Sequence, residues 1–158
     1  MQKTTTAKDK TMTILLTDMT KEDIPFIAAL EKECFSSPWS EKGLEEELTN
    51  ENAVFFTAKE SGRIVGYMGM HCILDECYIA NIAVSKDERR KGIGRLLLRF
   101  AEKRAKDKNC SFISLEVRVS NEGAVALYES ENYERMGERK NFYSSPTENA
   151  LIMTKNLK

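Results

Sequence analysis

Short runs of apolar and β-branched residues recur along the chain with the length and spacing of strands. They lie at 12–17, 53–58, 63–74, 77–84, 112–119, 133–139 and 150–155. The polar turn KESG, between the second and third of these runs, predicts a hairpin. The run CYIANIAV is apolar at nearly every position, so we expect a strand that is buried on both faces. In 112–119 apolar and polar residues alternate, which predicts only one face on the core.

Four other segments repeat apolar residues at the spacing of a helix. They are 21–34, a short segment after Ser40, 93–108, and a segment capped by Ser120 or Asn121. Trp39 precedes the Ser40 cap and is placed to contact Leu44 as a hydrophobic staple. The resulting order, βααβββαβαββ, predicts one α/β domain (an α+β mixed sheet with interleaved helices) over 12–158. We expect the polar segment 1–11 to be a disordered tail.

Composition narrows the classes of protein to consider. Lys and Arg number 24 against 25 Asp and Glu, so we expect neither direct nucleic-acid binding nor attraction to an anionic membrane. The four cysteines form no CxxC pair and His71 is the only histidine, so we expect free buried thiols and no metal. No apolar stretch approaches the ~20 residues of a membrane span, and the first residues lack the apolar run of a secretory signal. These features favour a cytoplasmic protein.

The stretch 88–98, ERRKGIGRLLL, follows the run 77–84 and begins the third predicted helix. It fits either a charged turn before an ordinary helix or a cradle for phosphate. In the second case, backbone N–H groups of 90–95 converge on an anion, and Gly92 and Gly94 leave room for a pyrophosphate. It is not a Walker P-loop, and Leu97 stands where a dinucleotide fingerprint needs a third glycine. The basic side chains that would add charge are Arg89, Arg90, Lys91 and Arg95.

Three longer motifs carry a resemblance to a known family. The runs CYIANIAVSKDERRKGIGRLLL, LEVRVSNEGAVALYESENY and RKNFYSSPTENALIM resemble the GNAT superfamily of acyl-CoA-dependent N-acetyltransferases. With PWSEK upstream, they are most similar to the RimI type, which acetylates the N-terminal alanine of a small-subunit ribosomal protein. The resemblance covers most of the chain from about residue 12. It implies the GNAT fold, acetyltransferase activity with acetyl-CoA as co-substrate, and no metal.

The resemblance also assigns roles to individual residues. The stretch 88–98, Ile93 included, would hold the pyrophosphate of coenzyme A, and Asn121 would contact the pantetheine arm, although its position is equally that of a plain helix cap. Glu116 would be the general base, where the pattern alone allows a carboxylate that faces water. Tyr128 would protonate the leaving thiolate, where spacing alone favours a core aromatic. The backbone groups expected to bind the pantetheine arm belong to Ile82, Ala83 and Val84. SENY departs from the family, which has a glycine before this tyrosine.

The acceptor can be narrowed by the ionisation of amines. An α-amine with a pKa near ~8 is about one tenth neutral at pH 7, whereas a lysine amine at ~10.4 is neutral about four times in ten thousand. This favours a protein N-terminus, whose first residues we expect Trp39 and Tyr143 to hold. Two alternatives stay open: an enzyme that acetylates a small amine or a lysine side chain, and a catalytically silent acyl-CoA-binding module. The presence of both Glu116 and Tyr128 argues against the silent module.

Overall fold

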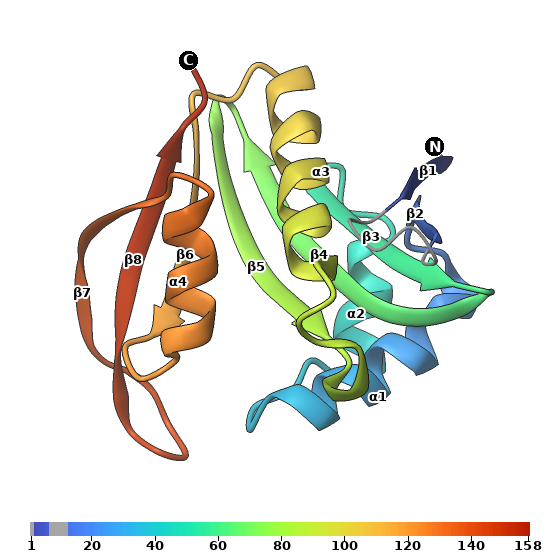
Figure 1. Cartoon of the computed structure of the whole chain (residues 1–158), viewed down its shortest axis with the longest axis horizontal. Coiled ribbons are helices and arrows are strands. Elements are labelled where there is room, and N and C mark those ends of the chain that lie inside the picture. Colours follow the sequence, from blue (N-terminus) through green and yellow to red (C-terminus); the bar gives the residue numbers. More distant parts are fainter. Residues whose placement is uncertain (1, 7–12) are drawn as a thin grey trace.

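The computed structural model describes residues 2–6 and 13–158, which form one twisted sheet and four α-helices (Figure 1). In chain order the elements are β1 (Gln2–Thr6), β2 (Thr13–Asp18), η1 (Lys21–Asp23), α1 (Ile24–Cys34), α2 (Glu41–Glu47), β3 (Ala53–Glu60), β4 (Arg63–Ile73), β5 (Glu76–Val84), η2 (Lys86–Glu88), α3 (Ile93–Asp107), β6 (Phe112–Arg118), α4 (Glu122–Ser130), β7 (Glu134–Tyr143) and β8 (Glu148–Asn156). From β2 onward, the strands and α-helices follow the predicted order βααβββαβαββ.

The strands lie in the order β1-β2-β3-β4-β5-β6-β8-β7. Among the described residues, every neighbouring pair is antiparallel except β5 and β6, which are parallel. A parallel pair needs a crossover connection, and α3 supplies it. The sheet is therefore mixed, as predicted, and α3 links its two parts.

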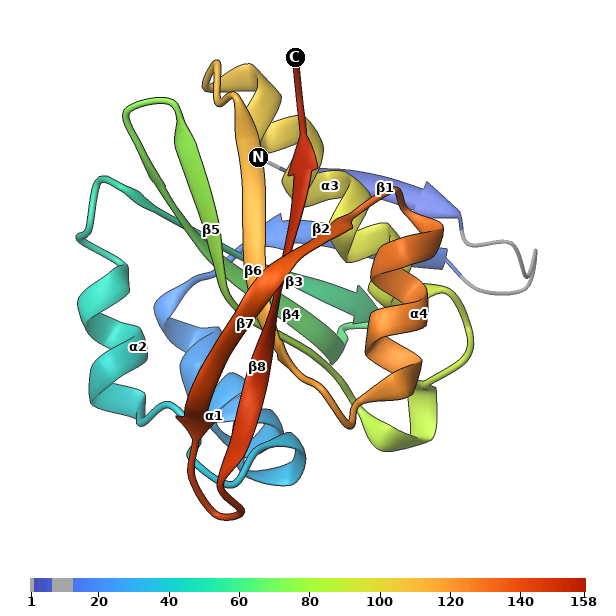
Figure 2. The same cartoon turned by 90° about the vertical axis from the view of Figure 1, so that its left-hand side faces the viewer.

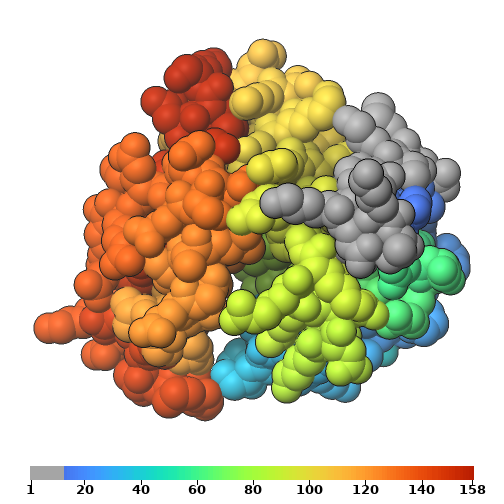
Figure 3. Space-filling view, in the orientation of Figure 1, coloured from blue at the N-terminus to red at the C-terminus, as the bar shows by residue number. Residues whose placement is uncertain are grey.

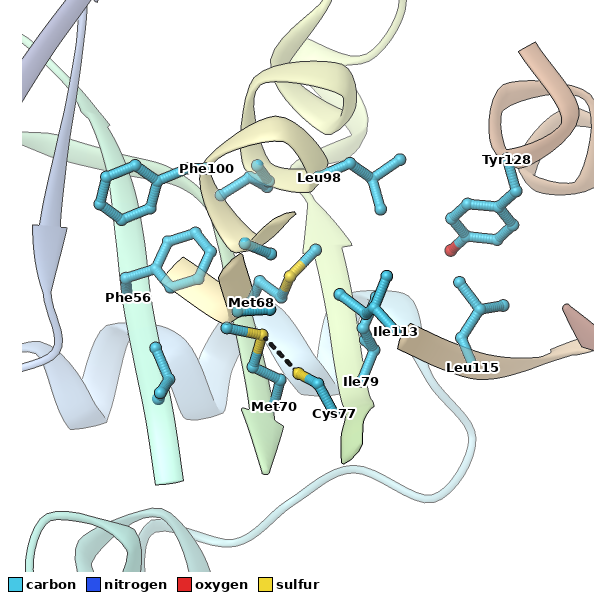
Figure 4. Packing of buried hydrophobic residues seen from close by; sticks show 14 of the residues in the cluster. Phe56, Met68, Met70, Cys77, Ile79, Leu98, Phe100, Ile113, Leu115 and Tyr128 are labelled. Atoms are coloured by element: carbon cyan, nitrogen blue, oxygen red, sulfur yellow. Dashed lines mark hydrogen bonds between the residues drawn. The ribbon is translucent and has the colours of Figure 1, made fainter. Parts of the chain in front are cut away.

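Helices cover both faces of the sheet (Figure 2), with α1 and α2 on one side and α3 and α4 on the other. Alternation along β3 sends neighbouring side chains into two separate cores. Phe56 packs with α3 in the larger core, which Figure 4 shows from close by. Phe55 packs with Tyr67, Leu44 and Trp39 in the smaller core under α1 and α2. Trp39 and Leu44 thus share a cluster, as the staple prediction requires.

The N-terminal segment differs in part from the expected disordered tail. Residues 2–6 form β1, which pairs antiparallel with β2 from Gln2↔Thr17 to Thr6↔Thr13. Three consecutive threonines favour an extended backbone, and β2 would otherwise present an unpaired edge. The remainder of the predicted tail, 7–11, lies outside the described residues.

Strand β5 is not buried on both faces along its whole length. Its first half alternates between exposed and buried side chains, and Tyr78 is 44% exposed. On the face away from α3, helix α1 reaches only the second half of β5, where Glu31 contacts Asn81 and Cys34 contacts Val84. An apolar sequence alone therefore overstated the burial of this strand.

The closing hairpin is longer than predicted, and its loop is correspondingly shorter. β7 extends to Tyr143 and β8 begins at Glu148, so the loop spans 144–147 rather than 140–149. Arg118 holds this loop, because its guanidinium donates to the carbonyls of Pro146 and Ser144 at 2.9 and 3.1 Å.

Candidate active site

The sheet divides between β5 and β6, which begin together and then separate (Figure 1). Only three residue pairs join them: Glu76↔Phe112, Cys77↔Ile113 and Tyr78↔Ser114. Beyond Tyr78, β5 keeps β4 as its only strand partner in the described part of the chain. A register shift opposite Gly69 and Met70 leaves Ala80 without a partner residue, and such a bulge bends a strand. We call the resulting gap between β5 and β6 the fork.

The backbone predicted to bind pantetheine lies on the open edge of β5 inside the fork. Residues 82–84 pair with β4 on one side, from Met68↔Ile82 to Gly66↔Val84, and have no strand on the other. Of the backbone groups in 82–84, the Val84 carbonyl also accepts hydrogen bonds from two side chains, Arg89 Nε at 3.1 Å and Cys34 Sγ at 3.6 Å. Arg89 thus turns back toward β5 instead of toward the start of α3.

The start of α3 has the geometry of an anion site. The first helical hydrogen bond runs from Leu96 N–H to Gly92 O at 3.1 Å, so the N–H groups of 93–95 have no acceptor within the helix. Those groups lie at the positive end of the helix dipole. Gly92 is the N-cap and has a φ of +85°, a left-handed conformation that favours glycine. Arg90, two residues earlier, is also left-handed, with a φ of +64°.

The two glycines of this stretch are needed for different reasons. A Cβ on Gly92 would have no atom within 4 Å, so its requirement is conformational. A Cβ on Gly94 would lie 3.1 Å from Leu127 Cδ2 of α4, so glycine here lets α3 and α4 approach closely. The pattern predicted space for a ligand at both positions, but it did not reveal the contact between the two helices.

Two of the four basic side chains in this stretch are paired with carboxylates. Lys91 Nζ lies 2.7 Å from Glu88 Oε2, and Arg95 Nε lies 2.9 Å from Glu131 Oε2. Arg90 has no carboxylate partner among the described residues. Positive charge at the start of α3 therefore comes from Arg90 and the backbone N–H groups more than from Lys91 and Arg95. The ion pairs instead fix the shape of the loop.

Glu116 lies on the side of β6 that faces away from the core, as the alternation predicted. Its side chain is 30% exposed, and Oε2 accepts a hydrogen bond from Arg139 Nε at 2.9 Å. Burial, and to a lesser extent the charge of Glu116, raises the pKa of Tyr143 to about 12. The guanidinium of Arg118 lies 4.5 Å from the centre of the Tyr143 ring. Neither arginine was predicted as a site residue, because the sequence marks each only as a charged residue on a strand.

Tyr128 projects from α4 toward β6 at the fork (Figure 4). Its side chain is buried, and this burial, with a smaller contribution from Tyr143, holds its pKa far above the usual range. The hydroxyl has no hydrogen-bond partner among the residues that the structure describes, whereas Tyr133, three residues beyond the end of α4, donates to Glu102 at 3.0 Å. Tyr128 is thus both a core aromatic and a protonated hydroxyl with no partner in the described chain.

Other predicted positions are occupied as follows. Asn121 caps α4, since its Oδ1 accepts from Ala124 N–H at 3.2 Å. Asn132 takes the place of the family's glycine and adopts a φ of +72°, the conformation that glycine would supply. Trp39 lies between α1 and α2, and its ring meets Phe55 edge-on with 5.6 Å between centroids.

The open end of the fork is bordered by two loops. Figures 1 and 2 both place the β7–β8 loop beside the loop between α1 and α2, so Tyr143 and Trp39 come from opposite borders of one opening. On another face, Figure 3 shows a hollow between α4 and the segment that begins α3, with the sheet at its base.

No group of three His, Cys, Asp or Glu side chains in the described part of the chain is arranged to hold a metal ion. All four cysteines are free: Cys72, Cys77 and Cys110 are buried, and Cys34 is partly exposed. None of the helices in residues 13–158 has the length and hydropathy of a membrane span.

Known proteins resemble this chain over most of its length. The Acetyltransferase (GNAT) family matches residues 24–133. A Bacillus subtilis protein, named provisionally as a ribosomal protein bS18-alanine N-acetyltransferase, is 36% identical over 137 residues, which cover 86% of this chain and 91% of that protein. The ribosomal protein bS18-alanine N-acetyltransferase of Escherichia coli K12 is 33% identical over 133 residues, or 83% of this chain and 89% of that enzyme.

Structural similarity agrees with the sequence matches. The crystal structure of the ribosomal-protein-S18-alanine N-acetyltransferase from Escherichia coli has a TM-score of 0.84 at 30% identity, and the match covers 92% of this chain and 94% of that one. Both the fold and the sequence thus confirm the expected resemblance. With a family match over more than half of its length and relatives above 30% identity, the chain belongs to the GNAT family of acetyl-CoA-dependent N-acetyltransferases.

Proposed function

We propose that this enzyme transfers an acetyl group from acetyl-CoA to the α-amine of a protein N-terminus, an N-terminal alanine of a small-subunit ribosomal protein. One observation carries the proposal: beyond Tyr78, the edge of β5 that faces β6 has no strand partner in the described chain, and it leads to the start of α3. Glu116 lies across this gap on β6, and Tyr143 and Trp39 belong to the two loops at its open end. The named relatives support the alanine acceptor. A ribosomal acceptor places the enzyme in the cytoplasm.

The residues on both sides of the fork fit acetyl-CoA. The N–H groups of 93–95 and the Arg90 side chain would hold its pyrophosphate, and Gly92 keeps that approach open. The free edge at 82–84 would bind the pantetheine arm as an added strand is bound, with Asn121 beside it. Acetyl-CoA supplies the thioester, and no metal is required for the transfer.

Glu116 is proposed to take the proton from the acceptor ammonium, either directly or through a water molecule. The hydrogen bond from Arg139 fixes the orientation of this carboxylate while leaving its other oxygen available. Partial exposure lets the carboxylate pass the proton on to solvent. An α-amine needs only modest help from a base, since about one tenth of it is neutral at pH 7.

Tyr128 is proposed to donate its proton to the sulfur that leaves. Burial keeps the hydroxyl protonated at working pH, and no described residue accepts that proton in competition. Tyr128 lies on α4, which covers the core side of β6, whereas Glu116 faces outward from the other side of that strand. Base and acid are therefore separate groups on separate elements.

An acetylation assay with different acceptors tests the function. Purified enzyme is given acetyl-CoA with a peptide that begins with alanine, with an Nα-blocked peptide that carries one lysine, and with a polyamine. We expect kcat/KM for the alanine peptide to exceed both others by at least a hundredfold. Faster acetylation of the blocked lysine peptide or the polyamine would overturn the proposal, and binding of acetyl-CoA without any transfer would indicate the silent module.

A further inference from the structure

Helix α1 carries a carboxylate that is unusually placed for a charged residue. Glu31 is 0% exposed, and no described cation forms an ion pair with it. Burial of a charged carboxylate destabilises the folded protein unless hydrogen-bond donors satisfy its oxygens. Removal of those donors would therefore also destabilise the fold. The side chain is therefore held by specific partners and not by general solvation.

Three donors from three different elements meet at Glu31. Its Oε1 accepts from the backbone N–H of Trp39 at 2.9 Å. Its Oε2 accepts from Asn81 Nδ2 at 2.7 Å and from the Tyr67 hydroxyl in a short hydrogen bond. Burial raises the pKa of Glu31, while these three hydrogen bonds lower it. The partners belong to the α1–α2 loop, to β5 and to β4.

Two of these partners lie at functionally different places. Asn81 is on β5 directly after the bulge residue Ala80 and directly before the open edge at 82–84. Trp39 lies in the loop that borders the acceptor mouth, one residue before the Ser40 cap of α2. One carboxylate thus joins the edge expected to bind the acyl donor to the loop expected to bind the acceptor.

We infer that Glu31 is a positioning residue that fixes the α1–α2 loop against β5, and so sets where the acceptor peptide lies relative to the thioester. The inference rests on the proposed function. Substitution of a residue needed only for folding would lower stability without changing the affinity for one substrate more than for the other. A positioning residue instead changes the affinity for the acceptor peptide and leaves the affinity for acetyl-CoA nearly the same.

Glu31→Gln is the variant that tests this role. This change keeps the size of the side chain but replaces one carboxylate oxygen with an amide nitrogen. Because that nitrogen cannot accept a hydrogen bond, the donors at its position lose their acceptor. Glu33→Gln is the matched control, because Glu33 is on the same helix and accepts a backbone N–H, that of Lys86 at 2.7 Å, which an amide oxygen can still accept. KM for the alanine peptide, kcat, and the Kd of acetyl-CoA by calorimetry are measured for both.

We expect Glu31→Gln to raise the peptide KM at least tenfold while the Kd of acetyl-CoA changes less than twofold and the control matches wild type. If Glu31→Gln does not fold, Tyr67→Phe replaces it and is expected to raise the peptide KM at least threefold. An unchanged peptide KM in the folded variant, or equal losses for both substrates, overturns the inference. A wild-type enzyme that does not acetylate the alanine peptide would instead overturn the proposed function, so the two failures are distinguishable.

Discussion

Two buried tyrosines, one in α4 and one just beyond it, allow effects on catalysis and on stability to be measured separately. Tyr128 and Tyr133 have ring centroids 5.9 Å apart, and both are nearly inaccessible to solvent. The Tyr133 hydroxyl donates to Glu102, which also accepts from Lys155 at 2.7 Å, whereas the Tyr128 hydroxyl has no described partner. Replacing each with phenylalanine removes one oxygen from the same core. The two variants should nevertheless fail in opposite ways.

The expected magnitudes follow from these contacts. Tyr128→Phe leaves no orphaned partner, so the free energy of unfolding should change by less than ~1 kcal/mol, while kcat falls ~10²–10⁴-fold because the leaving sulfur lacks its proton donor. Tyr133→Phe breaks a hydrogen bond to a carboxylate and should cost ~1.5–3 kcal/mol of stability, with kcat within about threefold of wild type. Urea unfolding and steady-state kinetics measure both quantities on the same samples.

A further measurement tests whether the step that Tyr128→Phe slows is protonation of the leaving thiolate. The rate of Tyr128→Phe should not recover at higher pH, but it should rise when the acetyl thioester is made from a more acidic thiol, which leaves without protonation. Wild-type kcat in Tyr128→Phe, or an equal fall in kcat in Tyr133→Phe, would refute the assignment of the acid.

Three other predictions follow from the site. Glu116→Gln should lower kcat at pH 7 by ~10²–10⁴-fold and regain up to about tenfold between pH 7 and 9.5 as solution supplies neutral amine; a flat pH–rate profile would contradict this. Gly92→Val should weaken acetyl-CoA binding at least tenfold by calorimetry with the circular dichroism spectrum retained, because a β-branched residue resists the φ of +85°. Hydrogen bonds from Arg99 and Arg95 lower the pKa of Glu131. The difference in stability between wild type and Glu131→Gln should therefore have its full value above the ordinary carboxyl pKa of 4.5 and shrink as the pH falls below it. Thermal unfolding of both proteins between pH 3 and 7 measures this difference.

Local signals were enough to predict most of the elements. The Ser40 and Asn121 caps are confirmed because each acts within three residues of its partner, Gly43 or Ala124. The alternation in β6 is confirmed from Leu115 to Arg118 but not at its ends, because Ser114 is buried and Val119 lies exposed beyond the strand. Such features are written in short windows of sequence.

Long-range features could not be predicted in the same way. The burial of Glu31 depends on Tyr67 and Asn81, which are 36 and 50 residues away, so the sequence EKE gave no sign of a buried carboxylate. Glu131 lies 36 residues from Arg95, and their pairing neutralises one of the four basic side chains that we expected to face the anion. The fork depends on a bulge and on where β6 joins the sheet, neither of which leaves a local pattern.

The fork also bears on how the protein avoids aggregation. An unpaired strand edge invites pairing with another chain, and β7, at the outer edge of the sheet, carries five charged side chains that oppose it. The open edge of β5 has no charged residue from 79 to 84 and would be far more adhesive if it were exposed. This edge lies in the gap between β5 and β6 and not at an outer edge of the sheet, so a second β-sheet has less access to it than to β7. The gap that we propose as the acetyl-CoA site would then also shelter an adhesive strand edge, and truncation of α4 should expose that edge and promote aggregation.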